Sequence, residues 1–189
     1  MLLENEKIKI RPLISSDVTK DYFNWFKDKL IKKYVVNTTY KDINHLKKYV
    51  FENSKKKNIL FLGIFTKKNK HIGNIKFEKI NIKKKSAVMG ILIGNKNFRN
   101  KGFSTSALTM TMQYLNKKKK IKYFFLGVNK KNIQAIESYY KSGFRISKEK
   151  KNTLIMIRNY DLLNLSKFSL GTAQFGMNYG VNNKFGKVK

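Results

Sequence analysis

Residues 87–107, AVMGILIGNKNFRNKGFSTSA, decide the fold expected for this chain. Their first part, 87–93, is an apolar run interrupted by one glycine, which predicts a buried strand. Their second part, 98–104, is a basic loop, and a helical pattern begins at Thr105. A loop of this kind aims backbone N–H groups at one point ahead of a helix N-terminus, as in phosphate-binding sites. The stretch therefore predicts a strand, an anion-binding loop and a helix.

Within this loop, Gly102 lets the backbone approach an anion closely, and Arg99 and Lys101 add positive charge. The loop is neither of the commoner phosphate loops, because it lacks a Gly-Lys-Ser/Thr ending and a G-x-G-x-x-G pattern. Taken alone, its Arg-x-x-Gly-x-Ser pattern is also compatible with an ordinary basic turn.

A second pattern lies downstream, where Asn132-x-x-Ala135 is followed by Tyr139 and by Gly143-Phe144. Together and in this order, the two patterns resemble the GNAT (GCN5-related N-acetyltransferase) family over about residues 7–160. In that family an R/Q-x-x-G-x-G/A loop holds the pyrophosphate of acetyl-CoA, and an N-x-x-A-x-x-x-Y-x-x-x-G-F stretch follows the next strand. The chain departs from the pattern at Ser104, where the family has Gly or Ala.

The resemblance implies acetyl-CoA as the co-substrate and no metal. It implies that the acetyl-CoA site is formed by Ile91, Leu92, Ile93, Arg99, Asn100, Lys101, Gly102, Phe103, Ser104 and Asn132. A backbone N–H near Leu92 is expected to point at the thioester carbonyl, which makes Leu92 a catalytic candidate. Tyr139 is expected to give its phenolic proton to the departing sulfur, with the adjacent Tyr140 as the alternative.

The general base is left unassigned. Many relatives place a glutamate on the central strand, but this chain has Ala87, Val88 and Met89 there. The remaining candidates are Glu78, Glu137, His71 and a chain of water molecules. The acceptor wall is expected to include Trp25 and Tyr34, with Tyr22 and Glu78 as further candidates, although the aromatic spacing also suits a core.

Three further segments, IKIRPL at 8–13, FNW at 23–25 and HIGNI at 71–75, narrow the resemblance to one branch. That branch holds ribosomal-protein-type acetyltransferases and sugar-nucleotide acetyltransferases of nonulosonate and surface-polysaccharide pathways. Within this branch, the first expectation is N-acetylation of an amino sugar carried on a nucleotide. The alternatives are acetylation of a protein N-terminus and, in another class, a non-catalytic protein that binds CoA or a polyanion.

The composition is strongly basic, with 42 Lys and Arg residues and a net charge of +31 in 189 residues. Only four of the 42 are arginine, the residue favoured for phosphate and base recognition, and the lysines fall in short runs at expected turns. We therefore expect no specific nucleic-acid partner, but a field that favours an anionic small-molecule acceptor. Because the sequence shows no cysteine, no leader and no membrane span, we expect a cytoplasmic protein. The oligomeric state is left open.

The periodicity predicts an α/β (α+β) fold whose sheet is mixed, mostly antiparallel and twisted, with helices on both faces. The resemblance implies the architecture of the GNAT family, with splayed central strands. Strands are expected at 8–13, 59–65, 72–80, 87–93, 123–128, 144–147 and 153–159. Helices are expected from Ser15 or Ser16 to 27, and at 39–53, 105–116 and 133–142.

The last segment has a different character. Residues 170–180, LGTAQFGMNYG, resemble the opening strand and loop of aldo/keto reductases, whose later catalytic residues are absent here. We expect an acetyltransferase domain over residues 1–163 and a truncated tail over 164–189 that does not fold independently and has no reductase activity.

Overall fold

The computed structural model of the chain describes residues 1–35 and 39–161. The chain divides into two units, Met1–Asn159 and Tyr160–Lys189, and the first carries every described helix and strand. The expected tail at 164–189 lies outside the described residues. No described helix is long and apolar enough to cross a membrane.

The first unit is built on one sheet with strand order β1-β2-β3-β4-β5-β6-β8-β7. The strands are β1 (Leu3–Glu4), β2 (Ile8–Pro12), β3 (Leu60–Thr66), β4 (His71–Asn81), β5 (Ser86–Ile93), β6 (Tyr123–Asn129), β7 (Arg145–Glu149) and β8 (Thr153–Asn159). All neighbours are antiparallel except β5 and β6, which are parallel. This confirms the expected mixed, mostly antiparallel sheet.

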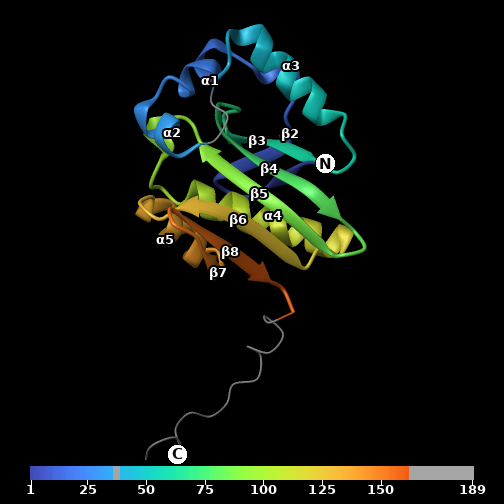
Figure 1. The fold of residues 1–189 in the computed structure, drawn as a ribbon. Coiled ribbons are helices and arrows are strands. Elements are labelled where there is room, and N and C mark those ends of the chain that lie inside the picture. The colour runs from blue at the N-terminus through green and yellow to red at the C-terminus, as the bar shows by residue number, and fades with distance from the viewer. Residues whose placement is uncertain (36–38, 162–189) are drawn as a thin grey trace, which may run out of the picture. The chain divides into compact units, whose positions relative to one another are not determined.

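The helices cover both faces of the sheet, as expected (Figure 1). They are α1 (Lys20–Trp25), α2 (Lys29–Tyr34), α3 (Ile43–Ser54), α4 (Phe103–Lys119) and α5 (Ile133–Lys141), with 3-10 turns η1 (Ser15–Asp17) and η2 (Lys96–Phe98). One core lies under α1–α3 and includes Tyr22, Leu46 and Phe61. On the other face, α4 buries a stripe that includes Leu108 and Met112.

The parallel pair β5–β6 is joined only at its beginning. Residues Ser86, Ala87 and Val88 pair with Tyr123, Phe124 and Phe125, and the pairing ends there. Beyond this point β6 continues along β8, and β5 continues along β4. The two central strands therefore separate, as the family resemblance implies, and a gap opens between their ends.

Several helix boundaries differ from the prediction, and side-chain caps set the starts of α1, α2 and α3. The first helix begins at Lys20, capped by Thr19, and the chain then starts an unexpected α2 whose cap is Asp28. Helix α3 begins at Ile43, capped by Asp42, rather than at residue 39. Helix α4 begins at Phe103, two residues earlier than expected, so the end of the predicted loop forms its first turn.

Candidate active site

Two cavities meet where β5 and β6 separate. The first, here called the loop-side cavity, has a volume of about 200 Å³ and lies among α2, the end of β5, the 99–104 loop and α5. The second, the aromatic cavity, has a volume of about 450 Å³ and lies over β4 and β5 under α1–α3. Six residues line both, so the cavities adjoin there: Tyr34, Val35, Ile91, Leu92, Gly127 and Tyr139.

The N-terminus of α4 lies beside the loop-side cavity. Asn100 and Gly102 both have positive φ, +59° and +78°, and Gly102 provides no side-chain cap for the helix. The N–H of Ser106 donates to the carbonyl of Gly102, which is the first intrahelical bond. The three preceding N–H groups, from Phe103 to Thr105, have no intrahelical partner and carry the positive end of the helix dipole. This end of α4 is suited to an anion.

The loop residues expected to bind the cofactor separate into two groups. Arg99, Asn100 and Ser104 line the loop-side cavity. Lys101 is exposed and lines neither cavity, Gly102 borders an adjacent hollow of about 360 Å³, and Phe103 packs edge-on against Phe98.

The guanidinium of Arg99 is engaged inside the fold. Its Nε donates to the carbonyl of Ile93 at 3.0 Å, and one Nη donates to the carbonyl of Gly94 at 2.8 Å. The other Nη lies 3.1 Å from the carboxylate of Asp28. Arg99 therefore joins the cap of α2 to the end of β5. The sequence had predicted only that its side chain would face a phosphate.

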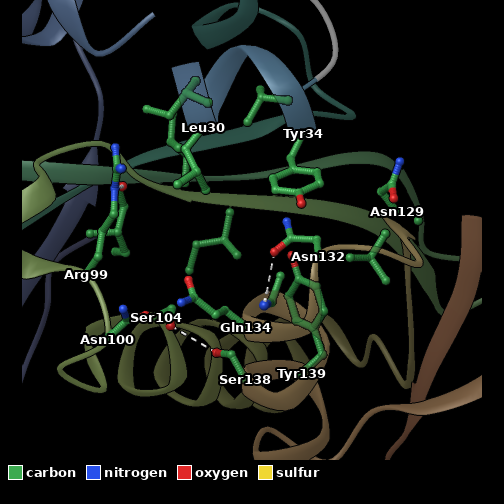
Figure 2. Close-up of a pocket in the computed structure, with 18 residues that line it drawn as sticks. Leu30, Tyr34, Arg99, Asn100, Ser104, Asn129, Asn132, Gln134, Ser138 and Tyr139 are labelled. Carbon is green, nitrogen blue, oxygen red and sulfur yellow. Dashed lines mark hydrogen bonds between the residues drawn. The ribbon is translucent and has the colours of Figure 1, made fainter. Parts of the chain in front are cut away.

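Helix α5 completes the loop-side cavity. The side chain of Asn132 caps this helix by accepting from the N–H of Ala135 at 3.3 Å, and it also lines the cavity. The hydroxyls of Ser104 and Ser138 lie 2.9 Å apart and link α4 to α5 (Figure 2). The serine that departs from the family pattern therefore joins two helices at the cavity floor.

Tyr139 lies at the junction of the two cavities. It is 8% exposed, and burial raises the pKa of its hydroxyl to about 12. The hydroxyl therefore keeps its proton at neutral pH. Tyr140 is 39% exposed and lines neither cavity. The geometry thus favours Tyr139 over its neighbour as the candidate proton donor.

The backbone of β5 is open on the side of β6 beyond the junction. Bonded and non-bonded pairs alternate along an antiparallel ladder, and the N–H of Gly94 donates to the carbonyl of Ile72 in β4. With the observed register, Leu92 also points its backbone groups at β4, whereas Ile91 and Ile93 point theirs into the gap. The free backbone N–H groups therefore belong to Ile91 and Ile93. The N–H donor expected near Leu92 is one of these two rather than that of Leu92 itself.

Three polar side chains of β4 face the aromatic cavity at alternate positions: Asn74, Lys76 and Glu78. The ammonium of Lys76 lies 2.8 Å from the Glu78 carboxylate and donates to the hydroxyl of Tyr49 at 3.0 Å. Burial lowers the pKa of Lys76, but Glu78 and Tyr49 outweigh it and raise the pKa above its usual value. The charges in this cavity are thus paired with one another.

The remaining candidates for the general base lie away from the junction. Glu78 is in register with Val88, four residues from Leu92, so it lies about 13 Å along the strand from Leu92. His71 lines neither cavity and is held in the core, and Glu137 is exposed on α5. No base is assigned among the described residues.

Only some of the residues expected in the acceptor wall lie at the cavities, and their role stays a prediction. Tyr34 points from α2 toward Asn132 and Tyr139, and its hydroxyl donates to the carbonyl of Lys131 at 3.1 Å (Figure 2). Tyr22 lines the aromatic cavity. Trp25 lines neither cavity, because it packs against Gly94, where an added Cβ would meet its ring at 2.0 Å.

A comparison with known protein families distinguishes an enzyme from a protein that only binds an anion. The family described as "Acetyltransferase (GNAT) domain" matches residues 7–145. The chain belongs to the GNAT acetyltransferase family. Its expected fold and its class, an N-acetyltransferase, are thereby confirmed. No curated protein sequence matches the chain.

Solved GNAT structures share this fold at low sequence identity. The ribosomal-protein-S5-alanine acetyltransferase from Vibrio fischeri is 16% identical, with 85% of this chain and 97% of that chain covered and a TM-score of 0.74. The spermidine N-acetyltransferase from Vibrio cholerae, in complex with CoA and spermine, is 18% identical, with 83% and 98% covered and a TM-score of 0.74. The microcin C7 self immunity acetyltransferase MccE, in complex with acetyl-CoA and AMP, is 19% identical, with 82% and 93% covered and a TM-score of 0.71.

Of the polar row of β4, the sequence predicted only Glu78 as a site residue; Asn74 was noted only within the HIGNI segment, and Lys76 was not noted. Asn74, Lys76 and Glu78 lie at alternate positions of β4, and Ile75 and Phe77 between them are buried. Such a polar row on one face of a strand is the signal that would have indicated them. Tyr49 gave no comparable signal, because aromatic residues at helical spacing are usual in a core.

Proposed function

We propose that the chain transfers the acetyl group of acetyl-CoA to a primary amine at the junction of its two cavities. The observation that carries this proposal is that both cavities share Ile91, Leu92 and Tyr139. Acetyl-CoA bound in the loop-side cavity and an amine bound in the aromatic cavity would meet at these residues.

The polar groups of the loop-side cavity suit acetyl-CoA, the acetyl donor. The uncapped N-terminus of α4 offers N–H groups to the pyrophosphate, and the exposed Lys101 adds positive charge nearby. The backbone N–H of Ile93 offers a donor to an amide-containing arm, as a further strand would, while its carbonyl already accepts from Arg99. Asn132 lies on the opposite wall.

The chemistry then uses two groups of the chain. Acetyl-CoA supplies a thioester whose carbonyl carbon is attacked by the lone pair of a neutral amine, after which the carbon–sulfur bond breaks. Ile91 lines both cavities, and its free N–H is the donor we assign to the negative charge that develops on the carbonyl oxygen. Tyr139 holds the proton that the departing sulfur takes up. The proton lost by the amine passes to water.

For the acceptor, we propose an amino sugar linked to a nucleotide. Support comes from the aromatic walls of the cavity, including Tyr40, Tyr49 and Phe61, which suit the apolar faces of sugar and base rings. The net charge of +31 favours an anionic acceptor over a polyamine. Glu78, the only carboxylate among the described residues of this cavity, is paired with Lys76 and offers little to a polycation.

The test is calorimetric titration of acetyl-CoA into the protein, followed by acetylation assays with UDP-linked amino sugars, spermidine and peptide N-termini. We expect micromolar acetyl-CoA binding and turnover with the amino sugars. Turnover with peptides alone would support the protein N-terminus as acceptor, and turnover with spermidine alone would contradict the acceptor class. Absence of acetyl-CoA binding would overturn the proposal and favour a polyanion-binding protein.

A further inference from the structure

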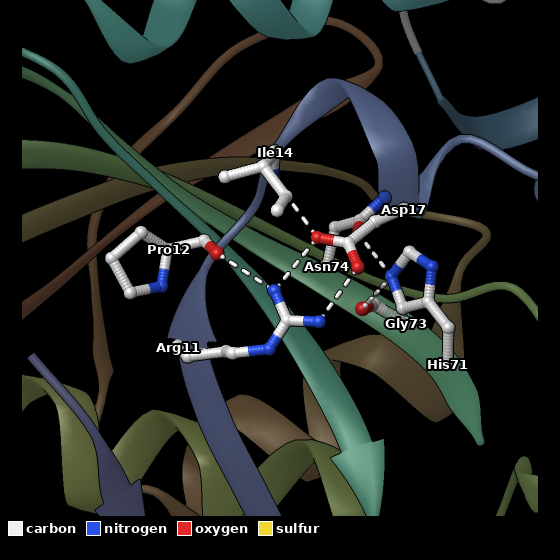
Figure 3. Close-up of polar contacts among 7 residues, drawn as sticks. All are labelled: Arg11, Pro12, Ile14, Asp17, His71, Gly73 and Asn74. Atoms are coloured by element: carbon white, nitrogen blue, oxygen red, sulfur yellow. Dashed lines mark hydrogen bonds and ion pairs between the residues drawn. The ribbon is translucent and has the colours of Figure 1, made fainter. Parts of the chain in front are cut away.

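A network of buried polar groups fixes one side chain of the aromatic cavity. His71 lies among Phe65, Trp25 and Tyr22, with ring centroids 4.8–5.0 Å from its own. Its Nε2 lies 3.0 Å from the carbonyl of Gly73 and 2.8 Å from the Oδ1 of Asn74 (Figure 3). Asn74 is 6% exposed and lines the cavity, whereas His71 does not.

The geometry determines which way the amide of Asn74 faces. A backbone carbonyl only accepts hydrogen bonds, so the contact with Gly73 requires that Nε2 of His71 carry a hydrogen. A nitrogen that donates to Gly73 also donates to its other neighbour, which must therefore be the amide oxygen. Consequently the oxygen of Asn74 is occupied by His71, and the amide nitrogen is turned away from it.

The amide nitrogen has two hydrogens that it can donate. Among the described residues no acceptor is hydrogen-bonded to this nitrogen, which leaves N–H donors for the cavity. A bound molecule that places an oxygen opposite the nitrogen gains a hydrogen bond there.

The donor lies beside the site of transfer. Asn74 is directly opposite Leu92 in the β4–β5 ladder, and opposed side chains on one face have Cβ atoms about 4.5–5.5 Å apart. The attacking amine must keep its lone pair for the thioester, so it cannot accept from Asn74 while reacting. An oxygen on the carbon next to the amine can accept.

We infer that Asn74, oriented by His71, selects acceptors that carry an oxygen on the carbon adjacent to the amine, such as a vicinal amino alcohol. This inference rests on the proposed function, because it concerns the acceptor of the same transfer. Asn74 contacts the acceptor, and His71 is a positioning residue that acts through it. The selectivity excludes polyamines, whose amines have only methylene neighbours.

The test compares two amines of the same shape, trans-2-aminocyclohexanol and cyclohexylamine, in the full chain with acetyl-CoA. The wild-type protein is expected to use the amino alcohol about tenfold better in kcat/KM, once corrected for the fraction of neutral amine. Asn74→Leu should reduce this preference to within about twofold. Asn116→Leu, which removes an amide bonded to the Ile121 carbonyl at the far end of α4, should keep it.

His71 is tested by rescue. His71→Phe leaves the Asn74 amide free to turn and should lower the preference, whereas His71→Gln keeps an N–H donor near the position of Nε2 and should restore it. A merely structural role would change the rates on both amines together and leave their ratio unchanged.

The outcomes separate this inference from the proposed function. A wild-type preference below about twofold, or a preference that survives Asn74→Leu, overturns the inference while acetyl transfer stands. The wild-type comparison needs no variant, so it decides the matter even if Asn74→Leu does not fold. Absence of acetylation of every amine overturns the proposed function, and this inference with it.

Discussion

Arg99 and Lys101 are two cations of one loop, and the structure predicts that their removal has different consequences. Arg99→Ala deletes three hydrogen bonds, to Ile93, Gly94 and Asp28, at a side chain that is 22% exposed. Each such charged bond contributes about 1.5–3 kcal/mol when formed alone. Because the three share one side chain and are partly solvated, we expect a loss of about 3 kcal/mol in the free energy of unfolding.

For a domain of this size, about 3 kcal/mol corresponds to a fall in Tm of about 6–12 °C. Since α2 carries Tyr34 and lines both cavities, its release should also raise the KM for both substrates. Lys101→Ala removes an exposed charge and should weaken acetyl-CoA binding by about two- to fivefold, in a salt-dependent manner, with Tm unchanged.

Differential scanning calorimetry and titration of acetyl-CoA into both variants measure these effects. Asp28→Asn keeps the cap of α2 but removes the charge that faces Arg99, so its effect should not add to that of Arg99→Ala. If Arg99→Ala unfolds within 2 °C of the wild type yet loses more than tenfold in acetyl-CoA affinity, Arg99 binds the cofactor directly and the reasoning above is wrong.

Three further predictions concern the junction and the buried histidine. Tyr139→Phe should lower kcat at least tenfold with acetyl-CoA affinity within threefold, whereas Tyr140→Phe should be silent; equal effects in steady-state assays would remove the assignment. Ile91→Pro removes a free N–H and should lower kcat by about 10²–10³-fold with the fold retained. Leu92→Pro removes a hydrogen bond between β4 and β5 and should lower Tm. The reverse result would contradict the assignment of the free N–H to Ile91. Burial lowers the pKa of His71 below its usual value, so its contribution to stability is complete above about pH 6.5 and is lost as the pH falls toward the folded pKa. Urea titrations between pH 5 and 8 should show this decline in the wild type and a smaller one in His71→Phe.

The elements that the sequence predicted are those with local signals. The apolar run at β5 and the glycine before α4 are read from neighbouring residues, and the separation of β5 from β6 followed from the family that those motifs indicate. Tyr139 was placed by its spacing from Asn132. Its burial at the junction favours it over the exposed Tyr140, and its catalytic role stays a prediction.

The features that were not predicted depend on contacts between distant segments. The carboxylate that holds Arg99 lies 71 residues away in sequence, at the cap of a helix that the periodicity did not indicate. A cation in a basic loop was therefore interpreted as free to bind phosphate. Likewise, the orientation of the Asn74 amide depends on the carbonyl of Gly73 and the tautomer of His71, which only the folded chain defines.

We propose that the strong positive charge of the chain attracts the acceptor, whereas the neutral groups of the aromatic cavity select it. A net charge of +31 acts over about a Debye length and attracts anions regardless of their structure. It cannot choose among them, because most of the described lysines are exposed and spread over many elements. Selection has to come from groups that lose contact with water when the acceptor binds. In the aromatic cavity the charges of Lys76 and Glu78 are already paired with each other. The discriminating contact is therefore left to a neutral donor, the amide of Asn74. This arrangement explains how a chain with so basic a surface can recognise the surroundings of one amine rather than bind every polyanion alike.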